Sequence, residues 1–568
     1  MSRVLFGGKA LREPTAAAQL RIGVQPAVNP NATNRVAILG PADGGVPQQL
    51  YTFNSFAEAA SVLRGGDGLK ACYHAFNPSP NFRGAAQIDF VRIDSGVAAS
   101  DVFTDGAGGG AKTAFTVTAV DKGIWTNGIL VQVSASASDR IVTIKVPSPA
   151  FQTGADGVAT VTGSIFESPS AKFITKGAKA GDALIVTANN YTTVTVYTIA
   201  TVVSETKVTV SETVTAGSGL TWQHVFYGRE QISPAIPAVS GTNNVNANIV
   251  AWINENAGDV VTATLGVVDA GLAAVTTGNH ALKGGTVIAP TNTDITNALV
   301  VIRPRQVSHI NIALACGTES GELNFAGLIT GHLNSADCEI PALGYIGAKA
   351  DKTVAAAITF AGALNSARLV YTFQTAYDAS LDGLETEEVP GYLLAAKVAG
   401  LAAGVDPQLP LTRKPLTVFG LKALPAAKIL DKATRESLLA AGVLHIFQPV
   451  GTNTFVINQA VTTLQKNNEL WDANSASSPE ISLMRIVDAV LTDLRLSAAE
   501  TFIGATATMA KPVIEHFVAS YLQSRVGDLL QSYSGVTVTQ SQDKWFIQFG
   551  MVPNYPVNFV LITGTIVG

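Results

Sequence analysis

The hydrophobic periodicity of the chain changes twice, and this change limits the folds that are open to it. Residues 34–94 alternate strand-like and helix-like segments, such as NRVAILG and SFAEAASVL. From about Ser95 to Ser240, runs such as RIVTIKV and YTTVTVYTIA alternate apolar and polar residues with period two, between Gly-, Ser- and Thr-rich turns. Helix and strand segments resume near Asn243. We therefore expect a β-rich domain, or two small ones, inserted into an αβ protein.

The region from 241 to 451 contains short apolar strands separated by helical segments. HINIALAC, ALGYIGA and ARLVYTF have strand character, and GELNFAGLITGHLN and VAAAITFAGALNS have helical character. Strands and helices that alternate at this spacing favour βαβ units. The pattern predicts a central α/β domain with a mostly parallel sheet.

Residues 452–556 predict two helices followed by two strands. The first helix starts at Pro479 and Glu480, and the second opens at Pro512, since proline is favoured in the first helical turn. The strands are VTVTQSQ and KWFIQFG. Apolar side chains at helical spacing are expected to face the core: Met484, Val487, Val490, Leu491 and Leu494 in the first helix, and Val513, Phe517, Leu522, Val526 and Leu529 from Pro512 onward.

Both ends of the sequence have the pattern of extended arms. Residues 1–24 lack helical periodicity and contain one short strand, Val4–Phe6. Residues 557–568, VNFVLITGTIVG, form a strand pattern without charge. Proteins usually protect an unpaired strand edge with Lys, Pro or a bulge, and this segment has no such protection. We expect it to pair with a partner.

Charged residues make up 14% of the chain and mean hydropathy is +0.28, against about a quarter charged in ordinary soluble domains. A neutral surface favours contact with other subunits. The most apolar stretches, 354–364 and 393–405, fall short of a spanning helix, so membrane insertion is not expected. The first residues lack the apolar region of a secretory signal, which predicts synthesis in the cytoplasm. A net charge of −5 without a Lys/Arg run argues against direct nucleic-acid contact.

No motif predicts catalysis, a cofactor or a metal. His309, Cys316, His332 and Cys338 lack the closely spaced pair that zinc sites usually contain. The acidic segment 378–392 lacks the calcium-loop register and is interpreted as a solvated loop. Phosphate-loop and nucleophile-elbow motifs are missing. An enzyme built on the central αβ region, and a capsid or adhesin-type structural protein, are the alternatives to a non-enzymatic assembly protein.

Three segments resemble the contractile bacteriophage (myovirus-type) tail sheath proteins. The first runs from GVQPAVNPNATNRVAILGPADGG to IDFVRID, and the second is LLAAKVAGLAAGVDPQLPLTRKPLTVFGLKAL. The third runs from INQAVTTLQKN through ISLMRIVDAVLTDLR to the end of the sequence. The order of these segments carries the resemblance. The usual Trp/Gly-Arg-Thr-Thr text of the family is AVTTLQ here, so the subfamily is open.

The resemblance implies an α+β multidomain fold. An αβ core domain would be assembled from both chain ends, 25–94 and 452–556, beside a central α/β domain at 241–451. An all-β domain at 95–240 would be inserted and face outward, and the arms would be 1–24 and 557–568. The implied function is that of a tail sheath subunit, which polymerises around the tail tube and contracts to drive the tube through the host envelope.

The implied partners are other copies of the chain in hexameric discs stacked helically, the tail tube protein, and the baseplate and tail terminator proteins. The chain would reside in the virion tail after assembly in the host cytoplasm. A related contractile device, of the tailocin or secretion type, is the alternative. The arms would add strands to a neighbour's sheet, with 536–550 as acceptor. The residues expected at this interface are Val4, Leu5, Phe6, Trp545, Ile547, Phe549, Val557, Phe559, Leu561, Thr563 and Ile566.

Overall fold

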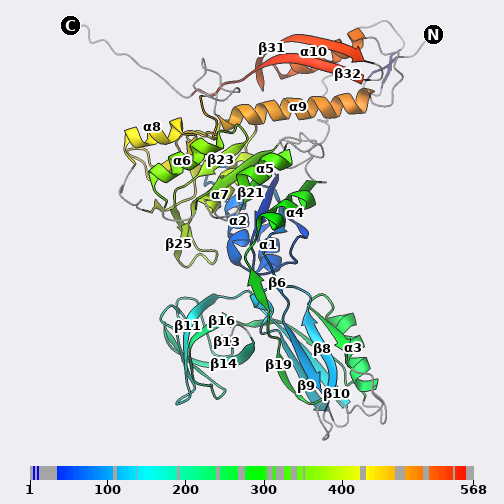
Figure 1. Cartoon of the computed structure of the whole chain (residues 1–568), viewed down its shortest axis with the longest axis vertical. Helices are drawn as coiled ribbons and strands as arrows, with labels where there is room; N and C mark the ends of the chain where they lie inside the picture. Colours follow the sequence, from blue (N-terminus) through cyan, green and yellow to red (C-terminus); the bar gives the residue numbers. More distant parts are fainter. Residues whose placement is uncertain are drawn as a thin grey trace.

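The computed structural model shows an elongated molecule with three parts along its long axis (Figure 1). A C-terminal lobe lies at one end, a domain built on a large sheet lies in the middle, and two β-rich units lie at the other end. The structure describes residues 4–6, 9–11, 35–105, 112–136, 139–188, 192–237, 244–266, 275–303, 311–314, 325–333, 342–348, 352–422, 430–466, 480–502, 511–541 and 544–557.

A seven-stranded sheet forms the middle part, hereafter the sheet domain. Its strands, in spatial order, are β28 (Val443–Leu444), β23 (Leu369–Thr372), β22 (Leu343–Gly347), β21 (Asn311–Leu314), β3 (Arg35–Gly40), β5 (Gln87–Arg92) and β4 (Leu50–Phe53). All neighbours pair in parallel except β4, which is antiparallel to β5. The strands are mostly apolar, as expected where helices cover both faces of the sheet.

The two helical layers have separate cores. One layer contains α1 (Phe56–Leu63), α2 (Gly66–Phe76) and α7 (Gly391–Ala403), which pack on Val36, Ile38 and Ile88. The other contains α4 (Asn292–Ile302), α5 (Phe325–Leu333), α6 (Val354–Leu364) and α8 (Lys432–Ala440), which pack on Ala37 and Leu39. Successive residues of β3 therefore serve opposite layers, as the pleat of a strand requires.

The sheet corrects the expectation that 25–94 forms a core domain with 452–556. β3 pairs with β5 on one edge and with β21 on the other, so residues 35–94 belong to the same sheet as the central strands. A strand buried on both faces needs partners on both edges, and β5 and β21 supply them for β3. The C-terminal segment builds its own core instead.

The inserted region leaves and re-enters the sheet domain through a two-stranded ribbon, β6 (Ser95–Val97) and β20 (Thr286–Ile288). Its first unit contains a three-stranded and a four-stranded sheet and one helix, α3 (Asn244–Asn256). The three-stranded sheet is β18 (Val261–Leu265), β8 (Thr113–Ala119) and β7 (Ser100–Thr104), and the four-stranded sheet is β17 (Tyr227–Ile232), β10 (Asp139–Pro147), β9 (Leu130–Ser136) and β19 (Gly278–Ala281).

The second unit is a closed barrel nested inside the first, because its chain runs between β10 and β17. Its strands are β11 (Gln152–Thr160), β12 (Ile165–Glu167), β15 (Lys207–Val210), β14 (Thr193–Ser204), β13 (Ala183–Ala188) and β16 (Gly217–Val225). The barrel has its own core around Phe166, Phe173 and Trp222.

Two features of the inserted region differ from the sequence expectation. The insertion does not end at 240. The later strands β18, β19 and β20 pair with β8, β9 and β6, which lie before residue 240. It is not all-β, because α3 packs on β8, β10 and β18. Pairing between strands far apart in sequence places the boundary near 288, and a local pattern carries no sign of that pairing.

The C-terminal lobe consists of α9 (Ile481–Phe502), α10 (Lys511–Arg525) and the hairpin β31 (Leu530–Ser541) and β32 (Lys544–Pro553). The helix-helix-strand-strand order matches the sequence expectation. Small sheets complete the described chain: β24 (Ala376–Ala379) with β25 (Thr386–Val389) and β27 (Gly420–Leu421), β26 (Pro415–Leu416) with β30 (Phe455–Ile457) and β29 (Ile446–Phe447), and β1 (Val4–Phe6) with β2 (Lys9–Leu11).

The expected inward stripes of the two C-terminal helices are partly wrong. Leu491 is 40% exposed and Val513 is 51% exposed. The first half of α9 is buried around its circumference because it lies between the sheet domain and the hairpin, as its buried Arg485 shows. The inward positions of α10 are Ile514, Val518 and Leu522.

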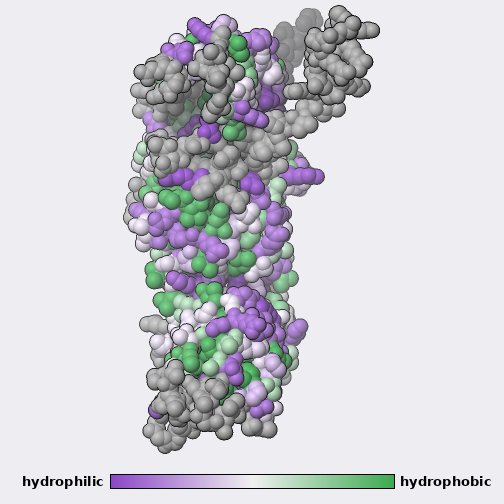
Figure 2. Space-filling view, turned by 90° about the vertical axis from the view of Figure 1, so that its right-hand side faces the viewer, coloured by the Kyte–Doolittle hydropathy of each residue, from purple (hydrophilic) through white to green (hydrophobic). Residues whose placement is uncertain are grey.

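The surface mixes hydrophobic and hydrophilic residues on the face shown in Figure 2. No helix within the described ranges is both long enough and apolar enough to cross a membrane.

Candidate subunit interface

The hairpin of the C-terminal lobe has one face turned toward α9 and α10. Trp545, Ile547 and Phe549 alternate along β32 and pack, partly buried, against a core that includes Val518 and Leu522. Phe546, between them in sequence, is 56% exposed on the outer face. This is the period-two alternation expected of a sheet with one covered face.

Among the described residues, the hairpin is a sheet of only two strands. β31 and β32 pair along their length from Leu530↔Pro553 to Ser541↔Lys544. Apart from a single bridge between Val526 and Leu530, no other described strand pairs with either of them. Each strand therefore has an outer backbone edge able to hydrogen bond with an added strand.

Buried polar contacts fix α9 to the sheet domain. The Arg485 guanidinium donates hydrogen bonds to the carbonyl oxygens of Ala402 and Val405, at the end of α7. Arg368, beside β23, donates to the buried carboxylate of Asp488. Burial lowers the pKa of Arg485 and raises the pKa of Asp488, although Arg368 opposes the second shift. The lobe is thus held by a cation and an anion one helical turn apart.

Further contacts fix α10 and the end of the hairpin. Arg525 pairs with Asp493 of α9 at 3.0 Å. Burial raises the pKa of Asp493, and Arg525 opposes this shift. Asn554, just after β32, donates its backbone N–H to the Leu529 carbonyl at 2.9 Å. Gln408 of the sheet domain reaches Asp528 at 3.0 Å. The hairpin is thereby positioned against both helices and the body of the molecule.

Three of the expected interface residues have side chains that face their own lobe. Trp545, Ile547 and Phe549 pack, partly buried, on the core formed with α9 and α10. Sequence alternation identified the strand, but it could not tell which face is covered. Phe546 and Val552, at 56% and 37% exposure, occupy the outer face instead.

The other expected interface residues belong to the arms. Val4, Leu5 and Phe6 form β1, which pairs with β2 in a short hairpin rather than standing alone. Val557 is 83% exposed. It borders a cavity of about 420 Å³ that Arg413, Arg435 and Phe447 also line. Phe559, Leu561, Thr563 and Ile566 lie outside the described residues.

No protein-family model matches the chain. Over 98% of its length the chain is 23% identical to the tail sheath protein of Bacillus phage SP01, of which it covers 96%. Over 86% of its length it is 24% identical to the putative tail sheath protein of Enterococcus phage phiEF24C, of which it covers 84%. The chain is similar to tail sheath proteins.

The fold agrees with this similarity. The sheath tail protein from Desulfitobacterium hafniense superposes with a TM-score of 0.54 at 12% identity, covering 96% of this chain and all of that chain. The chain therefore shares the mixed α/β multidomain fold of sheath proteins, and the expected resemblance to this family is confirmed.

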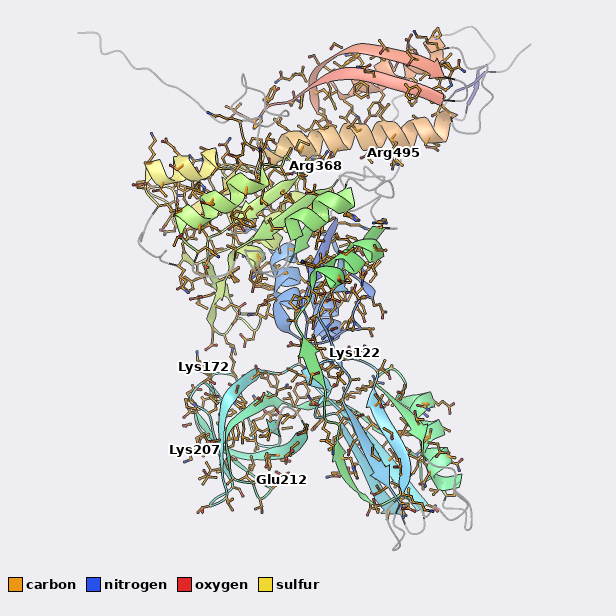
Figure 3. The ribbon with its side chains drawn as sticks, viewed as in Figure 1. Lys122, Lys172, Lys207, Glu212, Arg368 and Arg495 are labelled. Carbon is orange, nitrogen blue, oxygen red and sulfur yellow. The ribbon has the colours of Figure 1, made fainter. Side chains whose placement is uncertain are left out.

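The acidic segment of this sheath-like chain does more than form a solvated loop. The β24–β25 hairpin reaches the barrel, where Lys176 pairs with Asp382 at 2.6 Å and with Glu385 at 3.2 Å. Lys172, labelled in Figure 3, also pairs with Glu385. These contacts, hereafter the latch, hold the barrel against the sheet domain. Sequence analysis missed them because the lysines are remote in the chain and occupy an ordinary polar turn.

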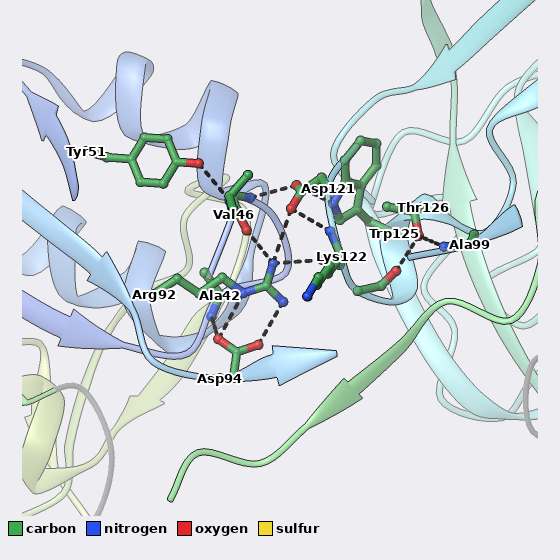
Figure 4. A network of polar contacts seen from close by, with 12 residues as sticks. Ala42, Val46, Tyr51, Arg92, Asp94, Ala99, Asp121, Lys122, Trp125 and Thr126 are labelled. Atoms are coloured by element: carbon green, nitrogen blue, oxygen red, sulfur yellow. Dashed lines mark hydrogen bonds and ion pairs between the residues drawn. The ribbon is translucent and has the colours of Figure 1, made fainter. Parts of the chain in front are cut away.

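A second junction, buried at the base of the insertion, was also missed. The Arg92 guanidinium donates to both carboxylate oxygens of Asp94, at 3.0 and 2.8 Å, and to the carbonyl oxygens of Gly45 and Lys122 (Figure 4). Asp121 accepts hydrogen bonds from the Gly45 N–H at 2.7 Å and from Trp125 Nε1 at 2.9 Å. These bonds join the sheet domain to the first unit of the insertion.

The geometry that bears on metal binding is limited. Of the four residues weighed for zinc, only His332 is described, and it is buried in α5. Burial, with Arg303 nearby, lowers its pKa to about 4. Within the described parts of the chain, no three His, Cys, Asp or Glu side chains are placed to hold a metal ion.

Proposed function

We propose that the chain is the sheath subunit of a contractile device, a phage tail or a related injection system, and that it polymerises helically around a tail tube. The similarity to tail sheath proteins along nearly the whole chain supports the class of protein. The proposed partners are further copies of the chain, the tube protein, and the baseplate and terminator proteins. The proposed location is the virion tail, after assembly in the host cytoplasm.

The observation that carries the joint between subunits is the β31–β32 hairpin with its two outer edges. In the proposed assembly, residues 557–568 of one subunit add as a strand to the hairpin of a neighbour, and the N-terminal arm adds to the other edge. About four to six main-chain hydrogen bonds, at roughly 0.5–1.5 kcal/mol net each, give a link of several kcal/mol. Such a link is repeated at every subunit of a helical assembly.

Contraction is proposed as a change of packing between two arrangements of the same subunits. The buried contacts of α9 keep the lobe fixed to the sheet domain, so the subunit body moves as a unit. In this proposal the arms act as the hinges between subunit bodies. The stored energy lies in the interfaces, and the proposed cycle uses no nucleotide.

The test is a matched pair of substitutions in the arm. Thr563→Pro removes one N–H donor from the added strand, whereas Thr563→Val keeps the donor and the strand propensity. We expect concentrated Thr563→Val protein and the unaltered chain alike to form hollow tubes or six-fold discs by electron microscopy. Thr563→Pro and a chain ending at Pro556 should give folded monomers. Normal tubes from both would refute strand exchange, and closed shells from the unaltered chain would refute the sheath function itself.

A further inference from the structure

Three titratable side chains meet in the core of the sheet domain. His74 comes from α2, Lys397 from the middle of α7 and Asp378 from β24. Their side chains are 0%, 0% and 2% exposed. They lie among apolar residues that include Leu394, Leu401 and Val418. Nothing in the proposed sheath function uses this cluster.

The contacts within the cluster are specific. Lys397 Nζ donates hydrogen bonds to Asp378 Oδ2 and to the carbonyl oxygen of Thr417. Asp378 Oδ1 accepts the backbone N–H of Ala379 at 2.8 Å. His74 Nδ1 lies 3.6 Å from Asp378 Oδ2, and neither ring nitrogen has a hydrogen-bond partner among the described residues. An unpartnered buried imidazole is costly and requires an explanation.

The surroundings favour the uncharged forms of Lys397 and His74. Burial lowers the pKa of Lys397, with Asp378 opposing the shift. Burial also lowers the pKa of His74 well below 6.5, and the nearby Lys397 and Lys70 lower it further. Removing two charges from a core is often neutral or stabilising compared with keeping them as an ion pair.

We propose that Lys397 and Asp378 condense within the folded chain into an isopeptide bond, with His74 as the group that moves the proton. The geometry places the amine, the carboxyl group, a backbone donor and an imidazole around one carbon atom, Cγ of Asp378.

The reaction balances without any added reagent. The Lys397 ammonium gives one proton to the Asp378 carboxylate, which leaves a neutral amine and a carboxylic acid. The amine lone pair attacks Cγ, and the Ala379 N–H stabilises the negative charge that develops on Oδ1. His74 takes a proton from Nζ and delivers it to the Oδ2 hydroxyl, which leaves as water. One C–N bond forms, one C–O bond breaks, no electrons are gained or lost, and the imidazole ends neutral.

The product would be a covalent link between β24 and α7. α7 packs on β21, β22 and β23 as well as on α2. The link would therefore join the β24–β25 hairpin covalently to a central helix of the sheet domain. A closed covalent loop restricts the unfolded chain, which raises the stability of the fold.

Mass spectrometry of the purified, unaltered full chain tests the proposal directly. We expect an intact mass lower than the sequence mass by one water molecule. Trypsin should fail to cleave after Lys397, and tandem spectra should show the 397 and 378 peptides as one branched species. An intact mass that equals the sequence mass, or cleavage after Lys397, would overturn the proposal. Loss of water traced to a succinimide at another aspartate would overturn it equally.

Matched variants separate the chemistry from folding. Asp378→Asn keeps the shape and should lose one ammonia molecule in place of water, because an amide leaves as ammonia. Lys397→Arg cannot condense and should keep its full sequence mass. His74→Asn should fold and condense more slowly, with a time course visible in the intact mass. Unchanged condensation in His74→Asn would remove the assigned role of the imidazole. None of these readouts depends on tube assembly, so their failure leaves the sheath proposal untouched.

Discussion

Arg368 and Asp488 form an ion pair between the sheet domain and α9, and the carboxylate is 1% exposed whereas the arginine is 27% exposed. Two sequence-distant elements thus meet through one buried anion. Arg485 of α9 also donates hydrogen bonds to carbonyl oxygens at the end of α7. Together with the ion pair, these bonds fix the angle at which the C-terminal lobe leaves the sheet domain.

The pair predicts a pH-dependent defect. Arg368→Met leaves the Asp488 carboxylate buried without its cation, which should cost about 3–5 kcal/mol at neutral pH. Burial already raises the pKa of Asp488 above its ordinary 3.8. Because this pKa is raised on folding, the protonated form of Asp488 contributes to the stability of the folded chain. That contribution is fully present below pH 3.8 and is lost as pH rises through the raised pKa of the folded state. The melting temperature of Arg368→Met, compared with the unaltered chain, should therefore recover as pH falls toward that range.

The double variant Arg368→Met with Asp488→Asn is the control for this effect. It contains no buried charge at this position, so its melting temperature should exceed that of Arg368→Met at neutral pH. A defect of equal size in the single and double variants would show that lost packing, not the unpaired charge, is responsible.

The latch predicts a local loosening when its charge is removed. Lys172→Gln breaks the contact with Glu385 between the barrel and the sheet domain, at a cost of about 0.2–1 kcal/mol for so exposed a pair. Lys207→Gln is the matched control, because Lys207 pairs with Glu167 inside the barrel. Amide hydrogen exchange in 380–388 should accelerate in Lys172→Gln and stay unchanged in Lys207→Gln. Acceleration in both would argue against a specific contact.

The same latch should weaken in acid and in salt. Hydrogen bonds from Lys176, Ser380 and Leu384 outweigh burial and lower the pKa of Asp382 to about 2. Stability from a lowered carboxyl pKa is present above the ordinary value of 3.8 and is lost as pH falls from there toward about 2. Protection of the amides in 380–388, measured as the exchange rate relative to the intrinsic rate at each pH, should therefore fall over that interval, and at neutral pH it should fall with added salt. Protection that changes with neither pH nor salt would contradict the latch.

The close approach of α2 and α7 predicts a strict glycine requirement. A Cβ at Gly400 would lie 2.2 Å from the Ala75 carbonyl oxygen, whereas a Cβ at Gly362 in α6 would have nothing within 4 Å. Gly400→Ala should destabilise the sheet domain by about 1–3 kcal/mol through overpacking. Gly362→Ala should leave stability equal or raise it by up to about 1 kcal/mol. Denaturant unfolding of the two variants gives the comparison, and equal midpoints would rule out the steric account.

The buried Arg92 predicts that the insertion depends on a single guanidinium. Arg92→Met leaves Asp94 inside the junction without its cation and should lower the melting temperature, with a cost of about 3–5 kcal/mol. Arg92→Lys retains the charge but cannot reproduce the bidentate bond, so it should recover part of the loss. Full recovery by lysine would show that charge alone, without the fork geometry, holds the junction.

Local patterns predicted those parts of the fold whose partners are close in sequence. The β31–β32 hairpin follows from two alternating runs, and both strands overlap the expected runs, although β31 begins earlier, at Leu530. The buried face of α9 is harder to predict from the sequence, because the sheet domain buries Arg485 and Asp488 as well as the apolar residues. Predictions from periodicity place charged residues in water. Here Arg485 contacts the end of α7, and Asp488 pairs with Arg368.

Long-range partners could not be predicted from the pattern. The two lysines of the latch are ordinary turn residues until the barrel places them beside Asp382 and Glu385. Similarly, β3 has no local sign that β21 will be its second neighbour. The free edges of β31–β32 follow from the strand pairs of the described residues, whereas the uncharged segment 557–568 by itself predicts only that a strand acceptor is needed.

The ribbon of β6 and β20 joins the whole insertion to the sheet domain at a single place. Its two strands are hydrogen bonded side by side, from Ser95↔Ile288 to Val97↔Thr286, so the chain departs and returns at one point. Everything beyond that point can be lengthened, replaced or removed without changing the strand order of the seven-stranded sheet. A protein of this design can change its inserted units while it keeps the sheet domain and the C-terminal lobe as they are.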